Sequence, residues 1–239
     1  MAERRTRRDG KRAASDEPSA TVEDYLHIIY YMTRDGRPIF GARLAEKLGV
    51  SPPTVAQTLK RMREAGLTWL DGRKEVQLTE RGRELAERIV RRHALAEHLL
   101  VDLLGLRWAE AHREAHHVEH AISPRIEERL LEVLGHPRTC PHGNPMPGAE
   151  QEETGAVTLP SLREGQRGVV TRIHEEAEED LRLLTFLEEH GVKPGAAVVV
   201  DEVAGYNGTV TLRVDERPVV LGERSAGHIW IRPSSESAV

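Results

Sequence analysis

The chain is short of cysteine and of long apolar runs, and each shortage excludes a class of protein. Cys140 is the single cysteine among 239 residues, so no disulfide can form within the chain and a reducing compartment is expected. No apolar run approaches the roughly 18 residues of a membrane-spanning helix, and no signal-peptide pattern is present. We therefore expect a cytoplasmic protein that does not engage a membrane.

The charge of the chain is unevenly spread. The formal net charge is −5, and residues 151–239 hold nine basic against sixteen acidic side chains. Residues 1–80 hold fifteen basic against twelve acidic side chains, which permits contact with nucleic acid without predicting it. Residues 1–20 are basic and almost free of apolar side chains, so we expect a disordered tail. The tail either adds attraction to phosphate or is simply solvated.

Three short helices and a hairpin are predicted between residues 21 and 80. Apolar positions recur at helical spacing over about 21–32, 41–48 and 52–65, and Gly49 and Gly66 end the second and third helices. Ser51 is a suitable N-cap with Pro52 in the first turn. Two β-favouring arms then flank Asp71-Gly72, which indicates a hairpin. This order is typical of a winged helix-turn-helix.

The outward side chains of the third helix suit the major groove of DNA. Gln57 can pair with adenine and the Thr54 methyl can meet thymine, whereas Lys60 suits phosphate. We predict a DNA interface made of these residues with the helix start and the wing tip, namely Ser51, Pro53, Thr54, Gln57, Lys60 and Arg73. The alternative is a small helical bundle that does not touch DNA.

Residues 112–120 contain four histidines and two glutamates, which are side chains that can bind a metal. No Gly or Pro lies between Trp108 and Ser123, so a helix is predicted, with four of these residues at i, i+4, i+7 and i+8 on one face: His112, His116, Glu119 and His120. Imidazole and carboxylate can together bind a divalent cation. The alternative is a solvated polar face.

A single helix seldom completes a metal site, so further ligands must come from elsewhere. A long helix is predicted from Thr79 to near Gly105, and His93 and Glu97 share a face of it. Cys140 and His142 lie in a Pro/Gly-rich loop, and because their spacing is no recognised zinc pattern we interpret the segment as a structured loop. The helices of 81–148 are rich in leucine and isoleucine, which predicts a helical homodimer interface.

The last third reads as a small β domain. After a polar linker at 149–155, short β runs separated by Gly and Pro indicate a small barrel over 156–239, interrupted by one short helix at 179–189. The fold class is therefore mainly α with a small β domain. In order, the parts are a tail (1–20), a winged helix-turn-helix (21–80), a helical metal-binding and dimerisation domain (81–148), the linker and the barrel.

Several ordered motifs resemble the diphtheria toxin repressor and manganese transport regulator family of metal-dependent transcriptional regulators. They include Thr-Val-Glu-Asp-Tyr-Leu from residue 21, Leu-Ala-Glu-Lys-Leu-Gly-Val-Ser-Pro-Pro-Thr-Val from residue 44, and Pro-His-Gly-Asn-Pro-Met-Pro-Gly from residue 141. The resemblance spans about 21–232. It implies that the barrel is the SH3-like (FeoA-type) domain of the longer members.

The resemblance also implies two metal sites. One uses Asp24, His116, Glu119 and His120, and in manganese-type members the positions of His27 and His93 join it. The other uses His93, Glu97 and His112. In the longer members a segment near Asp180 can add a ligand to the second site, but here we favour a solvated acidic patch.

The iron-type members have Met at the position of Asp24 and Cys at that of His116, and this chain has neither soft ligand. The oxygen of Asp24 favours Mn²⁺, whereas the imidazoles of His27 and His116 move the preference toward Fe²⁺, Co²⁺ or Zn²⁺. We expect a repressor of metal-ion homeostasis, activated for binding double-stranded operator DNA by Mn²⁺ or, second, Fe²⁺. It is not expected to be an enzyme or to take a small organic substrate. The alternatives are a helical metalloenzyme, or a DNA-binding regulator of an organic ligand with a structural metal.

Overall fold

The computed structural model describes residues 18–149 and 155–234 of the chain. It forms two compact units, the first ending at Gly82 and the second beginning at Arg83. The tail predicted over 1–20 and the linker predicted over 149–155 lie almost entirely outside the described residues. Within the described ranges, no helix has both the length and the apolar character to cross a bilayer.

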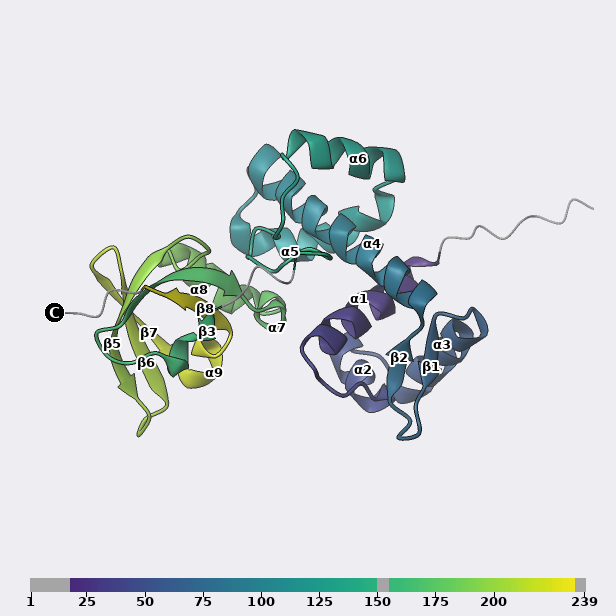
Figure 1. Cartoon of the computed structure of the whole chain (residues 1–239), viewed down its shortest axis with the longest axis horizontal. Coiled ribbons are helices and arrows are strands. Elements are labelled where there is room, and N and C mark those ends of the chain that lie inside the picture. Colours follow the sequence, from purple (N-terminus) through teal and green to yellow (C-terminus); the bar gives the residue numbers. More distant parts are fainter. Residues whose placement is uncertain (1–17, 150–154, 235–239) are drawn as a thin grey trace, which may run out of the picture. The chain divides into compact units, whose positions relative to one another are not determined.

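The first unit is a three-helix cluster with a β-hairpin (Figure 1). Its elements are α1 (Ala20–Arg34), α2 (Gly41–Leu48), α3 (Pro52–Glu64), β1 (Thr68–Leu70) and β2 (Val76–Leu78). Gly49 ends α2 in the left-handed conformation, at φ 63°, and the Ser51 hydroxyl accepts a hydrogen bond from the Thr54 amide to begin α3. Leu26, Leu44 and Met62 are fully buried between the helices. The predicted winged helix-turn-helix is confirmed.

The tip of the wing is held by one carboxylate. Asp71 accepts hydrogen bonds from the amides of Arg73 and Glu75, both at 2.8 Å, and the Asp71 amide donates to the Glu75 carbonyl. Lys74 adopts the left-handed conformation at φ 62° and closes the turn. The loop is therefore longer than a two-residue Asp-Gly turn, and Arg73 is exposed at its end.

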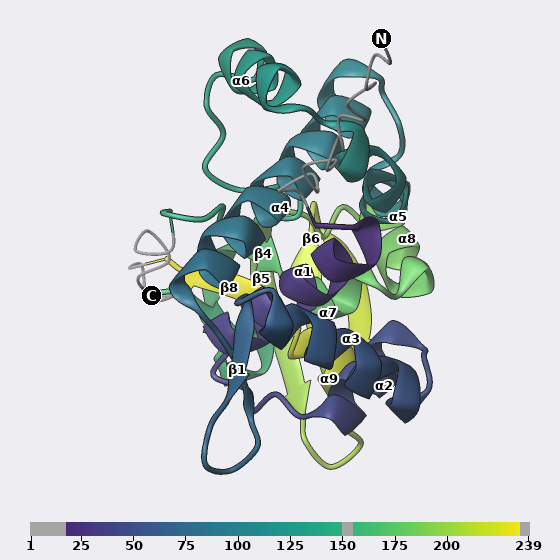
Figure 2. The same ribbon diagram turned by 90° about the vertical axis from the view of Figure 1, so that its right-hand side faces the viewer.

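The helix α4 (Glu80–His98) begins at the end of the first unit, runs into the second and continues as a π-helical turn, η1 (Leu99–Leu103). After these come α5 (Trp108–Val118), the 3₁₀ turn η2 (Glu119–Ala121) and α6 (Pro124–Val133), whose course can be followed in Figure 2. Leu95, Ala111, Ile122 and Leu130 belong to one buried cluster that joins α4, α5 and α6. The α-helix predicted to run through His120 thus ends at Val118, and the next three residues form a 3₁₀ turn.

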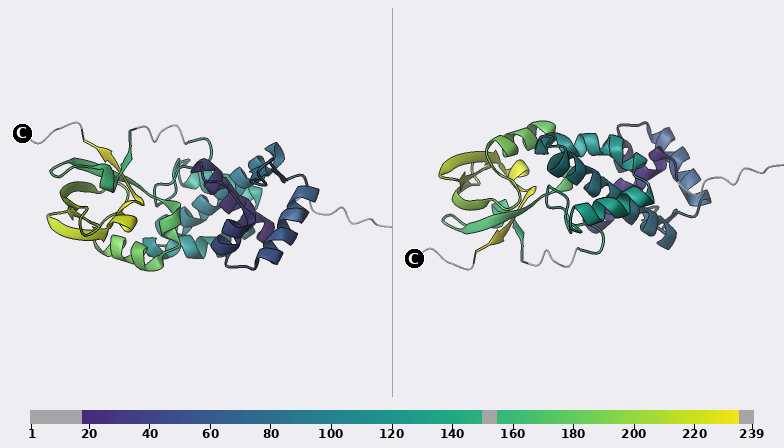
Figure 3. Two further views of the ribbon diagram at one scale, coloured as in Figure 1. Left: turned by 90° about the horizontal axis from the view of Figure 1, so that it is seen from below. Right: turned by 90° about the horizontal axis from the view of Figure 1, so that it is seen from above.

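The β part is one antiparallel sheet (Figure 3). Its strands are β3 (Val157–Thr158), β4 (Arg167–Ile173), β5 (Ala197–Ala204), β6 (Thr209–Val214), β7 (Arg217–Gly222) and β8 (Ile229–Pro233), with short helices η4 (Leu159–Ser161) and α9 (Glu223–Ala226). The strand order is β3-β8-β4-β5-β6-β7. The predicted closed barrel is wrong for the described residues, because the edge strands β3 and β7 do not pair. Irregular register in β4 and β5 bends the sheet instead.

The acidic segment after β4 also differs from the prediction. The single helix expected over 179–189 is two helices, α7 (Glu175–Glu178) and α8 (Leu181–Glu189). Asp180 separates them, because its carboxylate accepts hydrogen bonds from the Arg182 and Leu183 amides and so caps α8. The side chain of Asp180 is therefore used in the local fold.

The loop between α6 and β3 joins the helices of the second unit to its sheet. The Ile173 amide at the end of β4 donates to the His142 carbonyl at 2.8 Å, and the Asn144 side-chain amide donates to the Ile173 carbonyl at 2.8 Å. The Trp108 indole donates to the Pro141 carbonyl, and the Trp108 amide donates to Glu188 of α8. These bonds position both the start of α5 and the end of β4 against the loop.

Gly143 lies where this loop passes close to the backbone of β4. At φ +87°, a Cβ on Gly143 would lie 2.1 Å from the Thr171 carbonyl oxygen. An alanine in the left-handed conformation costs about 1–2 kcal/mol. Gly143→Ala should lower the free energy of unfolding by clearly more than this, because the added Cβ also clashes with the Thr171 carbonyl. Gly135→Ala is the matched control, because Gly135 has φ +70° and open space around the added Cβ. Equal losses of the two variants in urea unfolding would contradict this.

Candidate metal centre

The first cluster of the second unit surrounds the buried carboxylate of Glu119. The Nδ1 atom of His93 lies 2.5 Å from Glu119 Oε2. His116 Nδ1 and His120 Nε2 each lie 3.6 Å from Glu119 Oε1. The residues come from α4, α5 and η2, and the turn of η2 brings Glu119 and His120 to His116. One carboxylate and three imidazoles therefore converge.

The second cluster surrounds the buried carboxylate of Glu97. Glu97 Oε1 lies 3.1 Å from His93 Nε2 and 3.0 Å from His112 Nδ1, and those two nitrogens are 3.1 Å apart. His93 thus uses its two ring nitrogens toward two carboxylates, one in each cluster. The structure brings together the predicted second set of His93, Glu97 and His112, whose ligand atoms all lie within 4.8 Å of one another.

The loop that we interpreted as purely structural adds two donors to the second cluster. Cys140 and His142 are buried, and their ligand atoms lie with a carboxylate oxygen of Glu97 within the same 4.8 Å limit. His142 Nδ1 is 3.4 Å from Glu97 Oε2. The sequence held a signal, a Cys and a His two residues apart in a Pro/Gly-rich loop, but only the fold shows that it faces Glu97.

A further donor comes from α7. Glu178 is buried, and its Oε2 atom lies 2.8 Å from His112 Nδ1, while the Asn144 amide donates to its Oε1 atom. The favoured interpretation of the whole acidic run as a solvated patch is therefore wrong for Glu178. It holds better for Asp180, which is exposed and caps α8.

Burial and the converging carboxylates change the protonation of these groups. Burial alone would lower the pKa of His93, but the Glu97 charge and hydrogen bonds to Glu119 and Glu97 raise it to about 9. Burial is likewise outweighed at His112, whose pKa is raised well above its usual value by Glu178. Burial, with the charges of Glu97 and Glu178, raises the pKa of the Cys140 thiol. Without a cation, the cluster therefore holds imidazolium and thiol at neutral pH.

The donor set of the second cluster fits a divalent cation. Three buried atoms, Glu97 Oε2, His112 Nε2 and His142 Nδ1, make no hydrogen bond within the described residues. Buried polar atoms normally have partners, so such atoms are suited to a ligand. Carboxylate oxygen, imidazole nitrogen and thiolate sulfur are the donors that bind first-row transition metals.

The remaining predicted residues lie in the first unit. Asp24 and His27 lie on α1 of the first unit, whereas both clusters lie in the second unit. The part of Asp24 and His27 in a metal site therefore stays a prediction. Ser51, Pro53, Thr54, Gln57 and Lys60 are all exposed along α3 and its cap, and Arg73 is exposed on the wing. Their exposure meets the first requirement of an interface with DNA.

A cation that enters these clusters must displace protons. Because the pKa of His93 is about 9, this ring carries two protons at pH 7 and offers no lone pair until one leaves. Cation binding at pH 7 should therefore release at least one proton, and the affinity should rise with pH toward 9 and fall as the pH is lowered. Calorimetry of Mn²⁺ binding in two buffers of different ionisation enthalpy measures the release. Identical apparent enthalpies would contradict the expectation.

Three known protein domains match consecutive segments of this chain, in the same order as the parts described above. The N-terminal DNA-binding domain of iron-dependent repressors matches residues 18–76, and the metal-binding and dimerisation domain of iron-dependent repressors matches 79–148. The FeoA domain matches 157–233.

Whole-length relatives and solved structures agree with these matches. The iron-dependent repressor IdeR of Mycobacterium tuberculosis is 40% identical over 203 residues, covering 80% of this chain and 88% of that protein. The diphtheria toxin repressor of Corynebacterium diphtheriae is 33% identical, covering 84% and 92%. A manganese-dependent transcriptional repressor in complex with manganese is similar at a TM-score of 0.77 and 33% identity, covering 89% of this chain and 100% of that one.

These relatives agree with the winged helix-turn-helix and with the buried clusters of carboxylates and imidazoles. The chain belongs to the diphtheria toxin repressor family of metal-dependent, DNA-binding transcriptional repressors, which are not enzymes.

Proposed function

We propose that this protein represses genes of metal-ion homeostasis in the cytoplasm and that a divalent cation, Mn²⁺ in preference to Fe²⁺, activates it for operator binding. The observation that carries the proposal is the set of buried carboxylates and imidazoles at Glu119 and Glu97 in a chain whose recognition helix is exposed. No small organic substrate is involved, because the buried donors suit a cation.

DNA reading is assigned to α3 and the wing. The Ser51 cap fixes the start of α3, from which Pro53 and Thr54 project. Gln57, one turn further on, can pair with an adenine edge, and Arg73 of the wing can contact phosphate. Lys60 lies only 3.9 Å from Glu64 in an exposed ion pair, which is weak enough for a DNA phosphate to replace.

Activation is assigned to the first set of ligands. Asp24 and His27 of α1 would share a cation with His116, Glu119 and His120 of the second unit, and His93 would complete the set. These side chains would then hold the DNA-reading unit in a fixed position on the dimer. Because the cation binds this arrangement better than others, its binding raises the affinity for the operator.

The choice of metal follows from the donors. Asp24 and Glu119 supply hard oxygen atoms, which favour Mn²⁺, whereas the imidazoles of His116 and His120 also suit Fe²⁺, Co²⁺ and Zn²⁺. Similar proteins are named for iron and for manganese, and one solved structure is of ScaR with bound Cd²⁺. The oxygen donor of Asp24, at a position where the iron-type members have a thioether, is the reason that we favour Mn²⁺.

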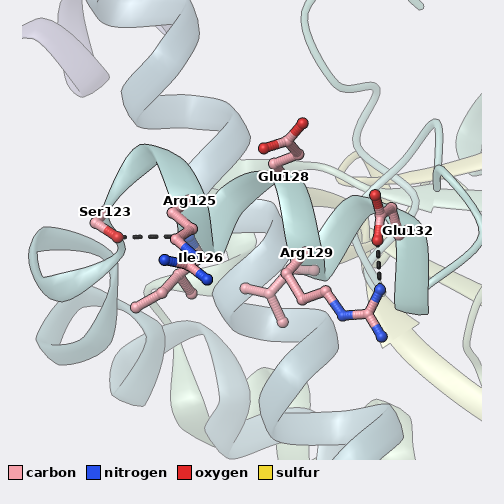
Figure 4. Close-up of a pocket in the computed structure, with 7 residues that line it drawn as sticks. Ser123, Arg125, Ile126, Glu128, Arg129 and Glu132 are labelled. Atoms are coloured by element: carbon pink, nitrogen blue, oxygen red, sulfur yellow. Dashed lines mark hydrogen bonds and ion pairs between the residues drawn. The ribbon is translucent and has the colours of Figure 1, made fainter.

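A second copy of the chain is proposed to cover the apolar side chains at the end of η1 and on α6. Leu103 and Leu104 are 49% and 62% exposed, and Ile126 and Val133 are 47% and 52% exposed. Figure 4 shows Ile126 beside the Ser123 cap of α6, with the Arg129–Glu132 ion pair further along the same shallow groove. Burying these side chains would stabilise a homodimer, whose two recognition helices would read half-sites about 34 Å apart.

The function is tested by anaerobic titration of operator DNA at fixed salt. With a chelator, binding should be weak and should not depend on DNA sequence. With buffered Mn²⁺, operator binding should become tight and specific. Fe²⁺, Co²⁺ and Zn²⁺ should produce the same binding only at higher free concentrations. Fluorescence anisotropy with DNA upstream of a metal-uptake gene measures this. Tight binding that does not depend on metal would favour a DNA-binding regulator that responds to an organic ligand.

Two histidines of the same segment provide the matched variants for this titration. His120→Ala removes an imidazole beside Glu119 and should abolish metal-dependent operator binding without unfolding the protein. His117→Ala changes an exposed ring of α5 and should bind as the wild type does. Circular dichroism checks the fold of both, and unchanged binding by His120→Ala would remove this residue from the site.

Sequence reading is tested separately by Gln57→Ala. Loss of a paired contact to adenine should weaken specific binding by about 1–3 kcal/mol and leave binding to random DNA unchanged. Lys60→Ala is the control, because loss of a phosphate contact should weaken both and lower the salt dependence. Equal losses on both DNAs for Gln57→Ala would assign it to phosphate contact instead.

A further inference from the structure

Hydrogen bonds join the end of the recognition helix α3 to the beginning of α4 within the first unit. The Thr79 amide donates to the Leu67 carbonyl at 3.0 Å, and the Thr79 hydroxyl donates to the Gly66 carbonyl at 2.7 Å. The Arg81 guanidinium donates to the Ala65 carbonyl at 3.3 Å. Backbone carbonyls need hydrogen-bond partners, and the partners of these carbonyls, which directly follow α3, come from the start of α4.

The Thr79 hydroxyl serves both helices at once. Its hydrogen lies between the carbonyls of Gly66 and Leu67, at 2.7 and 3.2 Å from the oxygen of Thr79. The same oxygen accepts a hydrogen bond from the Gly82 amide at 3.0 Å, as an N-cap of α4 does. A hydroxyl can donate and accept at the same time, so these contacts are compatible. Thr79 therefore ties the first turn of α4 to the end of α3.

Gly82 leaves the space that lets the two backbones approach. It is buried in the first turn of α4, and a Cβ at this position would lie 1.9 Å from the Leu67 carbonyl oxygen. Glycine inside a helix is less stable than alanine, so its advantage here is the missing side chain. By contrast, a Cβ on Gly41, the first residue of α2, would reach only a Val55 methyl at 3.8 Å.

From this joint α4 continues without a residue that would bend it. Beyond Gly82 the helix contains no further glycine and no proline before it ends at His98, and such residues are the usual causes of a kink. The same helix carries His93 and Glu97, which belong to the two clusters of buried carboxylates and imidazoles. The end of the recognition helix is thus attached to the helix that carries two candidate metal ligands.

We propose that this joint, formed by Thr79 and Gly82 against Gly66 and Leu67, transmits the metal signal to the recognition helix. A cation changes the operator affinity only if it favours one position of α3 over the others. The joint holds the end of α3 in one position against α4, so a cation that orders the ligands of α4 also orders α3. Thr79 and Gly82 are positioning residues, which act without contacting the cation or the DNA. This role rests on the proposed function and adds a route through α4 to the route through α1.

The first test removes the hydroxyl of Thr79. Operator affinity with Mn²⁺, divided by operator affinity with a chelator, measures the transmission. Thr79→Val keeps the shape of the side chain and should lower this ratio about tenfold, the effect of losing one helix-capping hydroxyl. Thr79→Ser keeps the hydroxyl and should retain the wild-type ratio. The Mn²⁺ affinity of the protein without DNA should be unchanged in both variants.

Gly82→Ala tests the same joint through its packing. The added Cβ should push the first turn of α4 away from the Leu67 carbonyl and lower the ratio as well. Gly41→Ala, whose Cβ has room, is the control and should retain the ratio. By linkage, operator DNA should raise the Mn²⁺ affinity less in Thr79→Val and Gly82→Ala than in the wild type, which a general loss of stability would not cause. Circular dichroism and thermal unfolding show whether each variant is folded.

Hydrogen exchange of the wild type tests the joint without any substitution. The amides of Thr79 and Gly82 donate within the joint, so both should exchange much more slowly than the amide of the exposed wing residue Gly72. Exchange of the two joint amides as fast as that of Gly72 in the Mn²⁺-loaded protein would overturn the proposal, because a joint that opens so easily cannot hold α3.

The binding data separate this role from the proposed function. A wild-type ratio well above one that stays unchanged in Thr79→Val and Gly82→Ala would reject the joint alone. Equal losses of affinity with Mn²⁺ and with chelator would also reject it, because Thr79 would then only stabilise the first unit. A wild-type ratio of one would reject the proposed function itself, and with it any signal for the joint to transmit.

Discussion

The burial of two carboxylates, Glu97 and Glu178, is the constraint on which the second unit depends. A buried carboxylate without a charged partner is strongly destabilising, so both must be surrounded by donors or cations. His112 lies between them, at 3.0 Å from one and 2.8 Å from the other, and Asn144 donates to Glu178. The loop that carries Asn144 is itself held to β4 by hydrogen bonds with Ile173. The helices and the sheet are therefore joined at the cluster.

The helix changes from α to 3₁₀ after Val118, so Glu119 and His120 lie on the turn while His112 and His116 lie on α5. On a continuous helix, His112, His116, Glu119 and His120 would have formed one stripe. In the structure, His112 faces Glu97 and Glu178, while His116 and His120 lie at Glu119. His93 contacts a carboxylate of each cluster through its two ring nitrogens. The two clusters are consequently neighbours, and a proton or cation at one changes the electrostatics of the other.

This arrangement explains how metal binding can control DNA binding without any change inside the recognition helix. α3 is capped by Ser51 and its outward side chains are already exposed, so its local structure needs no metal. In the function that we propose, the cation therefore acts outside α3.

The amino-acid sequence by itself determined the local elements, because their causes are local. Helix caps such as Ser51, the left-handed Gly49 and the spacing of His93 and Glu97 predicted α2, α3 and a shared ligand face. The resemblance to a known family added the prediction of two metal sites. Only the tertiary structure decided that Cys140 and His142 face Glu97, that Glu178 faces His112, and that β3 and β7 leave the sheet open. These features depend on contacts between segments far apart in the chain, which no local spacing encodes.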